Sequence, residues 1–420
     1  MSFDLLQLNP RIRENIKVLG FEVPTAIQRK AIPPIMEGRD VIGLAQTGTG
    51  KTAAFGIPLL QRLLNGPRRQ LRMLIIGPTR ELAEQTLEAL NALGAHTNLH
   101  CVSLYGGVGI QPQIASLRRG AEIAVACPGR LLDHMRQGTI RLSQIECLVL
   151  DEGDRMFDMG FLPDIRQILQ KLPVARQTLL FSATMPDEIR GLAHDAMRNP
   201  LIFQIAHSRP AESVSHALYP VPQHLKTALL LAILARTDRE SVLVFTRTKH
   251  RAKRLAVNLV RSGHRATCIQ GNLSQNQRKE AMDGFRNGTF QILVATDIAA
   301  RGIDVSTISH VINFDMPNSV DDYTHRIGRT GRAAKTGDAF TLTTPDDGDV
   351  VRDIERVLGA KIERRTLESF DYDAKPPQFT HPASRDATHR HPGGNRPGKT
   401  GSQRSGPSGR PHRQREHVRR

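Results

Sequence analysis

Short apolar segments rich in β-branched residues alternate along this chain with longer stretches whose apolar residues recur at helical spacing. Parallel strands covered by helices produce this alternation, so the sequence predicts an α/β fold with mostly parallel sheets. The first strand segments lie at 41–45, 73–77, 100–105, 122–127, 147–152 and 178–183. A second set follows at 241–246, 266–271, 291–297, 310–315 and 338–344. Helices are predicted at 80–93 and 249–262.

The two sets of strands are separated by a polar segment without strong periodicity, so we expect two α/β domains of comparable size. The first domain is expected at 1–205, the linker at 206–217 and the second domain at 218–370. Residues 371–420 contain 11 Lys or Arg against 4 Asp or Glu, with scarcely any large apolar side chains. A segment of this composition cannot bury a core, so we expect a disordered basic tail there.

The chain is strongly basic, with 58 Lys plus Arg against 41 Asp plus Glu and a formal net charge of +17. This charge favours a polyanionic partner, nucleic acid first and an anionic membrane surface second. The longest apolar run, 228–235, is much shorter than the about 20 residues of a membrane span, and the N-terminus does not match a signal peptide. The four cysteines form no CxxC pair, which favours reduced thiols. We therefore expect a cytoplasmic protein without a membrane partner.

A glycine-rich loop, AQTGTGKT at 45–52, directly follows one predicted strand and leads into a plausible helix. A phosphate-binding loop has this context. Its glycines would let backbone N–H groups close around phosphates, Lys51 would contact the outer phosphates, and the Thr52 hydroxyl would ligate Mg²⁺. Ala45 replaces the first glycine of the usual GxxxxGK[ST] pattern, and a simple glycine-rich turn is the alternative.

An acidic cluster, Asp151-Glu152-Gly153-Asp154, lies at the end of the predicted strand 147–152. Open α/β sheets bind ligands at the carboxyl ends of their strands, where these carboxylates would lie. We expect Asp151 to hold Mg²⁺, and Glu152 to orient and deprotonate the water that attacks a γ-phosphate. An acidic, solvated turn is the ordinary alternative, and the buried strand together with the phosphate loop argues against it.

The order of these and further motifs resembles the DEAD-box family of ATP-dependent RNA helicases from Phe3 to about Leu358. In the first domain the similar segments are GFEVPTAIQ (20–28), AQTGTGKT (45–52), PTRELA (78–83), PGR (128–130), DEGD (151–154) and SAT (182–184). In the second they are LVFTRT (243–248), QGNLSQNQR (270–278), ATDIAARGID (295–304) and HRIGRTGR (325–332). The phrase DRMFDMGF (154–161) and the short start before the first motif are most similar to the bacterial RhlE-like subgroup.

The resemblance implies two tandem RecA-like domains that close over ATP and single-stranded RNA. The implied activity is RNA-stimulated ATP hydrolysis, coupled to local unwinding of short RNA duplexes or to remodelling of RNA–protein complexes. The residues implied for ATP binding are Phe21, Gln28, Gln46, Thr47, Gly48, Thr49, Gly50, Lys51, Thr52, Gly302 and Asp304, with Phe3 helping to hold the adenine. The implied catalytic residues are Lys51, Asp151, Glu152 and the arginine fingers Arg329 and Arg332.

Three further groups of residues take their roles from the same resemblance. Mg²⁺ would be held, partly through water, by Thr52 and Asp151. The RNA sugar-phosphate backbone would lie along Thr79, Arg80, Gly107, Arg130, Gly271 and Thr296. Hydrolysis would be coupled to domain closure by Ser182, Thr184 and His325.

Several of these residues also have a simpler interpretation. Phe3 and Phe21 could pack in a core, and Thr79 could cap a helix. The basic run at 325–332 could be a solvated surface. We expect Asp297 to serve mainly packing between the domains, and it is not included among the site residues.

Two positions depart from the family's pattern: Gly153 stands where the family has Ala, and Cys127 where it usually has Thr. Added backbone freedom at Gly153 could change the coupling between hydrolysis and domain closure, or the stability of the fold, by roughly 1 kcal/mol. A thiol is a weaker donor than a hydroxyl, so RNA affinity could fall modestly.

A nucleotide-controlled RNA clamp with little hydrolysis and a DNA helicase are the alternative functions. Ribosomal and mRNA-decay complexes are candidate partners.

Overall fold

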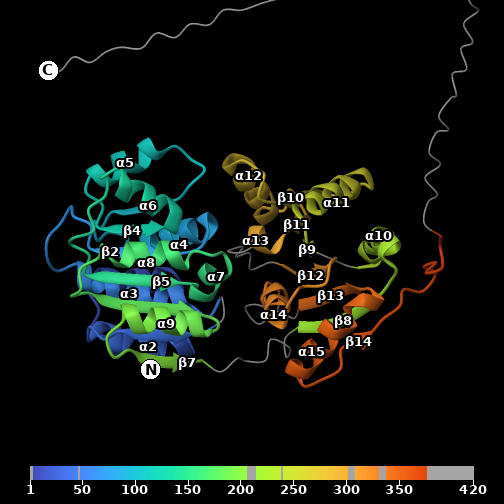
Figure 1. Cartoon of the computed structure of the whole chain (residues 1–420), viewed down its shortest axis with the longest axis horizontal. Coiled ribbons are helices and arrows are strands. Elements are labelled where there is room, and N and C mark those ends of the chain that lie inside the picture. Colours follow the sequence, from blue (N-terminus) through green and yellow to red (C-terminus); the bar gives the residue numbers. More distant parts are fainter. Residues whose placement is uncertain are drawn as a thin grey trace, which may run out of the picture. The chain divides into compact units, whose positions relative to one another are not determined.

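The computed structural model describes residues 3–45, 48–205, 214–237, 240–300, 308–330 and 337–375 (Figure 1). Both sheets belong to one compact unit that ends at Ala374. Within the described ranges, no helix combines the length and the apolar character needed to cross a membrane.

The first sheet contains seven parallel strands in the order β3-β4-β2-β5-β6-β1-β7. Their bounds are β1 (Val41–Leu44), β2 (Met73–Ile76), β3 (Cys101–Leu104), β4 (Ile123–Ala126), β5 (Cys147–Asp151), β6 (Gln177–Ser182) and β7 (Leu201–Gln204). Strands β1 to β5 lie in the predicted segments, and β6 begins one residue before its predicted segment. Strand β7 was not predicted, and its side chains alternate between partly buried and exposed, as expected at the edge of a sheet.

Apolar side chains cover both faces of this sheet because successive residues of a strand point to opposite sides. On β2, Met73 and Ile75 belong to one core cluster, and Leu74 and Ile76 belong to the other. The first cluster includes residues of η1 (Phe3–Leu5), α1 (Pro10–Val18), α2 (Ala26–Met36), α3 (Lys51–Leu63) and α4 (Arg80–Leu93). The second is joined by α5 (Ile110–Arg118), α6 (Pro128–Arg136), α7 (Gly153–Asp158), α8 (Leu162–Leu169) and α9 (Asp187–Ala196).

The second sheet also contains seven parallel strands, in the order β10-β11-β9-β12-β13-β8-β14. Their bounds are β8 (Val214–Pro220), β9 (Val242–Phe245), β10 (Ala266–Ile269), β11 (Ile292–Ala295), β12 (His310–Asn313), β13 (Gly337–Thr343) and β14 (Glu363–Arg364). Two tandem RecA-like α/β domains, as expected, therefore make up the folded part. Strand β8 begins inside the predicted linker, because Val214 and the residues after it pair with β13. The other linker residues, 206–213, lie outside the described ranges.

The helices of the second domain pack around this sheet in the same manner (Figure 1). They are η2 (Gln223–Leu225), α10 (Lys226–Arg236), α11 (Lys249–Arg261), α12 (Gln275–Arg286), α13 (Asp297–Ala300), α14 (Val320–Ile327), η3 (Pro345–Asp347) and α15 (Gly348–Leu358). The chain after β14 packs on the domain further than the predicted boundary at 370. Phe370 and Tyr372 rest against the core with ring centroids 4.8 Å apart, and His224 Nε2 donates to the Ala374 carbonyl at 2.8 Å.

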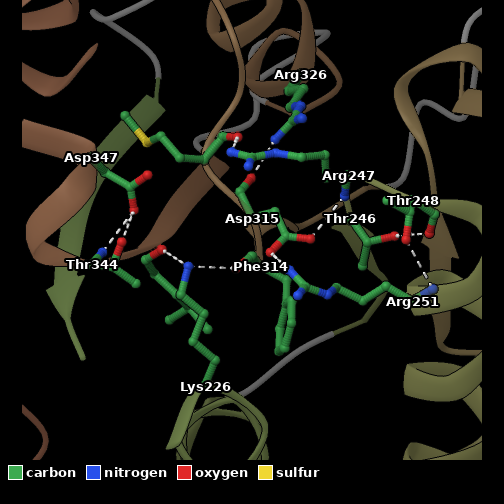
Figure 2. Close-up of polar contacts among 12 residues, drawn as sticks. Lys226, Thr246, Arg247, Thr248, Arg251, Phe314, Asp315, Arg326, Thr344 and Asp347 are labelled. Atoms are coloured by element: carbon green, nitrogen blue, oxygen red, sulfur yellow. Dashed lines mark hydrogen bonds and ion pairs between the residues drawn. The ribbon is translucent and has the colours of Figure 1, made fainter. Parts of the chain in front are cut away.

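Positive side chains from three helices converge on the carboxyl end of β12 (Figure 2). Lys226 from α10 is buried and donates to the Phe314 carbonyl at 3.2 Å. Arg251 from α11 forms an ion pair with the buried Asp315 carboxylate. Arg326 from α14 donates to the Asp315 carbonyl at 2.7 Å. This strand end therefore ties three helices of the second domain together.

Candidate functional site: a nucleotide cleft and a neighbouring RNA pocket

A cleft of about 740 Å³ lies at the carboxyl ends of strands β1 and β5, within the usual size range of a small-molecule site. Most of the predicted ATP-binding and catalytic residues that the structure describes line it. These are Phe21, Gln28, Gly48, Gly50, Lys51, Thr52, Asp151, Glu152 and Arg329. The cleft thus collects side chains from segments far apart in the sequence.

The loop before α3 has the backbone conformation that close contact with phosphate requires. Gly48 and Gly50 have φ angles of 84° and 88°, which residues with a side chain rarely adopt. A Cβ atom at Gly50 would also lie 2.4 Å from Gln28 Nε2. Helix α3 begins at the next residue, Lys51, and the N–H groups of a helix's first turn lack partners within the helix. The loop and helix together form an anion-binding cradle.

Lys51 lies near two buried carboxylates at the end of β5. Its Nζ donates to the Ala45 carbonyl at 3.1 Å. Burial raises the pKa of the Asp151 carboxyl to about 6, although the charge of Lys51 opposes the shift. The Asp151 carboxylate and the Thr52 hydroxyl line the same cleft, and both are hard oxygen donors of the kind that suits Mg²⁺. A cation at this place would favour the ionised form of Asp151.

Glu152 is held by a buried ion pair that the sequence analysis missed. Arg155, in the first turns of α7, donates to Glu152 Oε2 at 2.6 Å, and both side chains are 4% exposed. Burial acts to raise the pKa of Glu152, but the charges of Arg155, Lys51 and Arg329 outweigh it and hold this pKa below its ordinary value. The carboxylate is therefore ionised at neutral pH. The spacing of three residues on a helix was the available signal.

Asp154 connects the acidic cluster to the segment after β6. Its Oδ2 accepts the N–H of Ala183 at 3.1 Å and the N–H of Thr184 at 2.9 Å, and its own N–H donates to Ser182 Oγ at 3.0 Å. His325 faces the same carboxylate. Burial and the charge of Arg155 lower the pKa of His325 to about 4, although Asp154 opposes the shift, so the imidazole is neutral at pH 7.

Gln28 and Phe21 line the cleft beside the loop. The Gln28 side chain is buried, accepts the Thr25 N–H at 2.9 Å and donates to the Gly50 carbonyl at 3.2 Å. Phe21 is 36% exposed, and its ring stacks on that of Phe3 with centroids 6.4 Å apart. Phe3 therefore packs in the core, as its simpler interpretation expects, whereas Phe21 remains accessible to a ligand.

A second pocket, of about 470 Å³, contains the predicted RNA-binding residues Thr79, Arg80, Arg130 and Gly271. Arg130 Nη1 is buried in it without a hydrogen-bond partner among the described residues. Leaving such a donor unpaired costs about 1–3 kcal/mol, and a phosphate oxygen would satisfy it. Thr79 also acts as a helix cap, because its Oγ1 accepts the Leu82 N–H at 3.3 Å.

Among the other predicted residues, Gly107 lies next to this second pocket. It has a φ of 81°, and a Cβ atom there would lie 2.1 Å from Arg80 Nη1. Thr296 follows β11 and does not line the pocket. The Thr49 carbonyl accepts the Thr25 hydroxyl at 2.8 Å. The residues outside the described ranges are Gln46, Thr47, Gly302, Asp304 and Arg332.

Asp297 forms an ion pair within its own domain and also lines a small pocket with Arg155 of the first domain, so packing between the domains stays a prediction. Its carboxylate receives Arg326 Nε at 2.6 Å and Arg326 Nη2 at 2.8 Å. Arg326 also donates to Asn313 Oδ1 at 3.2 Å and lies 5.1 Å from the centroid of the Phe245 ring. The pair therefore fixes α14, the helix that leads to Arg329. The sequence did not predict this contact because Asp297 and Arg326 are 29 residues apart.

The chain is similar to known RNA helicases in sequence and in structure. The DEAD/DEAH box helicase family matches residues 25–192, and the helicase conserved C-terminal domain matches 225–334. The DEAD-box ATP-dependent RNA helicase CshA of Geobacillus kaustophilus is 43% identical over 371 residues, which cover 88% of this chain and 79% of that protein. The CshA of Limosilactobacillus reuteri is 43% identical over 363 residues, which cover 86% and 73%. The structure of S. cerevisiae Dbp5 bound to RNA and ADP BeF3 superposes with a TM-score of 0.78 at 30% identity, covering 87% of this chain and 95% of that one.

Gly153, at the start of α7, leaves room for a buried leucine. A Cβ atom at this position would lie 2.9 Å from Leu180 Cδ1. We expect Gly153→Ala to be destabilising by about 1 kcal/mol, because overpacking costs about 1–3 kcal/mol while the better helix propensity returns about 1 kcal/mol. Urea unfolding measures the change.

Leu180→Val removes the atom that the new methyl group would meet, so the two substitutions should be coupled. In a double-mutant cycle, the combined loss of stability should be about 1 kcal/mol smaller than the sum of the single losses. Gly191→Ala in α9 is the matched control, because no atom lies within 4 Å of the added Cβ, and it should be neutral or stabilising. Additive losses at 153 and 180 would contradict the steric interpretation.

Proposed function

This chain belongs to the DEAD/DEAH box helicase family, and from this premise we propose how its own residues act. It is an ATP-dependent RNA helicase, which couples RNA-stimulated ATP hydrolysis to local unwinding or remodelling of RNA. The observation that carries the assignment of residues is the cleft in which Lys51, Asp151, Glu152 and Arg329 meet.

The cradle at the start of α3 would bind the phosphates of ATP through its backbone N–H groups. Lys51 would contact the outer phosphates, and Thr52 with Asp151 would hold Mg²⁺. Bound with ATP, Mg²⁺ neutralises charge on the phosphate oxygens. Glu152, kept ionised by its positive neighbours, would orient the attacking water, and Arg329 would stabilise the charge of the transferring phosphoryl group. A carboxylate with a lowered pKa is a weak base, so orientation outweighs proton abstraction in this proposal.

The coupling between hydrolysis and RNA binding would pass through Asp154. This carboxylate accepts hydrogen bonds from the N–H groups of Ala183 and Thr184, and it faces His325 of the second domain. The Asp154 N–H donates to Ser182 Oγ. A change at the γ-phosphate would therefore be transmitted to α14 through contacts that already exist. The pocket with Arg80 and Arg130 would hold the RNA backbone, without reading its sequence.

The finer placement of the protein is also a proposal. The two bacterial relatives described above are named CshA, whereas the phrase DRMFDMGF and the short start support an RhlE-like subgroup. Ribosomal or mRNA-decay complexes as partners and a location in the cytoplasm rest on the family and on composition alone.

The first prediction for this function concerns catalysis. Glu152→Gln should still bind ATP but lose at least about 100-fold in turnover, because the water loses its orienting carboxylate. Lys51→Ala should instead weaken ATP binding. Phosphate release at saturating RNA and binding of a labelled nucleotide measure the two effects. Glu188→Gln, at an exposed position of α9, is the control with the same chemical change.

Near wild-type hydrolysis by Glu152→Gln would show that the assignment of the water-orienting residue is wrong. The same assay, run without RNA and with DNA of equal length, also distinguishes the RNA helicase from a clamp that hydrolyses little and from a DNA helicase.

The second prediction concerns base selectivity. A side-chain amide can accept from adenine N6 and donate to N7, and guanine reverses one of these partners. Gln28 lines the cleft, so ATP should be hydrolysed in preference to GTP, and Gln28→Ala should reduce this preference. The ratio of kcat/KM for the two nucleotides measures it. Equal use of both by the wild-type protein would refute the role of Gln28.

The third prediction concerns the basic tail, which we propose to be a flexible arm that captures structured RNA. Residues 375–420 contain 11 Lys or Arg and 2 Asp or Glu. A chain ending at Ala374 keeps Phe370 and Tyr372 packed, so it should retain ATPase turnover at saturating RNA but need more RNA to reach it. When the logarithm of its RNA-binding constant is plotted against the logarithm of the salt concentration, the slope should become shallower. The change should be about 0.7 for each single-strand phosphate that the shortened chain no longer binds. Unchanged RNA affinity and salt slope would support a merely solubilising tail.

A further inference from the structure

Helix α11 and its flanks form the most one-sided concentration of charge in the folded part of the chain outside the nucleotide cleft and the RNA pocket. Residues 247–265 contain seven Lys or Arg and no Asp or Glu. Lys253, Arg254 and Arg261 are exposed, and no hydrogen bond or ion pair holds any of them among the described residues. Their charges are therefore available to a partner.

Four of these helix positions form a straight polar ridge. Arg251, Arg254, Asn258 and Arg261 follow one another at intervals of three or four residues and so share one side of α11. Ten residues of helix separate the first from the last, which corresponds to about 15 Å. We call these residues the α11 ridge.

The α11 ridge borders a pocket of about 290 Å³ that has no acidic residue in its lining. Arg251, Arg254 and Asn258 of the ridge line it together with His224 and Thr227. The guanidinium, hydroxyl and amide groups together form a set of donors for phosphate oxygens. The pocket and the ridge therefore both offer positive charge and hydrogen-bond donors to an anion.

Arg251 is held in place, which gives the ridge one rigid end. Figure 2 shows its guanidinium against the Asp315 carboxylate, which also accepts the Arg247 N–H at 2.8 Å. Asp315 is buried, whereas the Arg251 side chain is 31% exposed. One face of the guanidinium is thus fixed from within the domain while the rest remains accessible from the pocket.

The chain also leaves the folded part beside this pocket. The Ala374 carbonyl accepts a hydrogen bond from His224, which lines the pocket. The residues that follow, 375–420, carry a net charge of +9. RNA attracted by this segment would therefore be concentrated near the ridge.

We propose that the α11 ridge and its pocket bind the phosphate backbone of a double-stranded RNA segment that adjoins the single strand in the core. Proteins that bind single strands usually stack bases on aromatic side chains. Residues 247–265 contain no Phe, Tyr or Trp, and Phe314, which lines the pocket, is only 4% exposed. Double-stranded RNA is instead recognised through its shape and its phosphates. The proposal rests on the proposed RNA-helicase function and adds a second RNA-binding surface to it.

The test uses the full chain with two double variants. Arg254→Ala/Arg261→Ala removes two charges from the ridge and leaves Arg251 and Asp315 intact. Arg352→Ala/Arg356→Ala removes two charges from α15 in the same domain, where these side chains are 70% and 78% exposed. The probes are a labelled hairpin with a single-stranded overhang and the overhang alone. Thermal melting checks that both variants fold.

The ridge variant should bind the hairpin about tenfold more weakly. The slope of its log binding constant against log salt concentration should become shallower by about 1.8, which is about 0.9 for each of two duplex phosphates that the variant no longer binds. Its affinity for the overhang alone and its ATPase rate at saturating overhang should stay within about twofold of wild type. The α15 variant should match wild type with both probes. Equal weakening in both variants, or weaker binding of the overhang alone, would overturn the proposal.

Two further outcomes keep this proposal separate from the proposed function. If the overhang fails to stimulate ATP hydrolysis by the wild-type protein, the helicase mechanism fails, while the comparison of hairpin affinities still decides the role of the ridge. If a glutamate-rich peptide binds the wild type through Arg254 and Arg261 while hairpin affinity is unchanged in the ridge variant, the surface serves an acidic protein and the RNA proposal is wrong.

Discussion

Charges that are buried together at the carboxyl end of β5 constrain the whole first domain. Lys51, Asp151, Glu152 and Arg155 are each at most 7% exposed. A buried charge that loses its partner costs about 3–5 kcal/mol, so these four side chains must be brought together correctly. Strand β6 lies between β1 and β5 in the sheet, and it thereby sets the distance between Lys51 and the carboxylates. Glu152 even adopts a left-handed backbone with φ of 56°, which this network of pairs stabilises.

The second domain uses the same principle at the end of β12, with backbone carbonyls as well as carboxylates as partners. Lys226 binds the Phe314 and Leu342 carbonyl oxygens, whereas Arg326 binds the Asp297 carboxylate on both oxygens. The Arg326 guanidinium offers several donors in one plane, so it joins the Asp297 carboxylate after β11 to Asn313 and Asp315 at the end of β12. Because Arg326 belongs to α14, the orientation of the helix that leads to Arg329 depends on contacts far from the nucleotide.

Sequence reasoning succeeded where one local pattern decides the structure. Helix α4 has the predicted bounds, since apolar spacing and a Thr79 cap define it, and the glycine-rich loop identified the cradle. Strand β8 was missed because three consecutive buried residues follow a polar segment, so neither alternation nor a long apolar run is present. The Asp297 ion pair was missed because its partners are 29 residues apart in sequence. The Glu152–Arg155 pair was missed because its three-residue spacing does not report burial, which depends on the packing of several elements.

The aromatic pair near the N-terminus links the beginning of the chain to the nucleotide cleft. Phe3 is 4% exposed within the core cluster, and its ring stacks on Phe21, which lines the cleft. The third residue of the chain is therefore part of the support for a ligand-facing ring. Replacing Phe3 by a small residue would therefore loosen a ring that faces the nucleotide, although Phe3 itself is not among the residues that line the cleft.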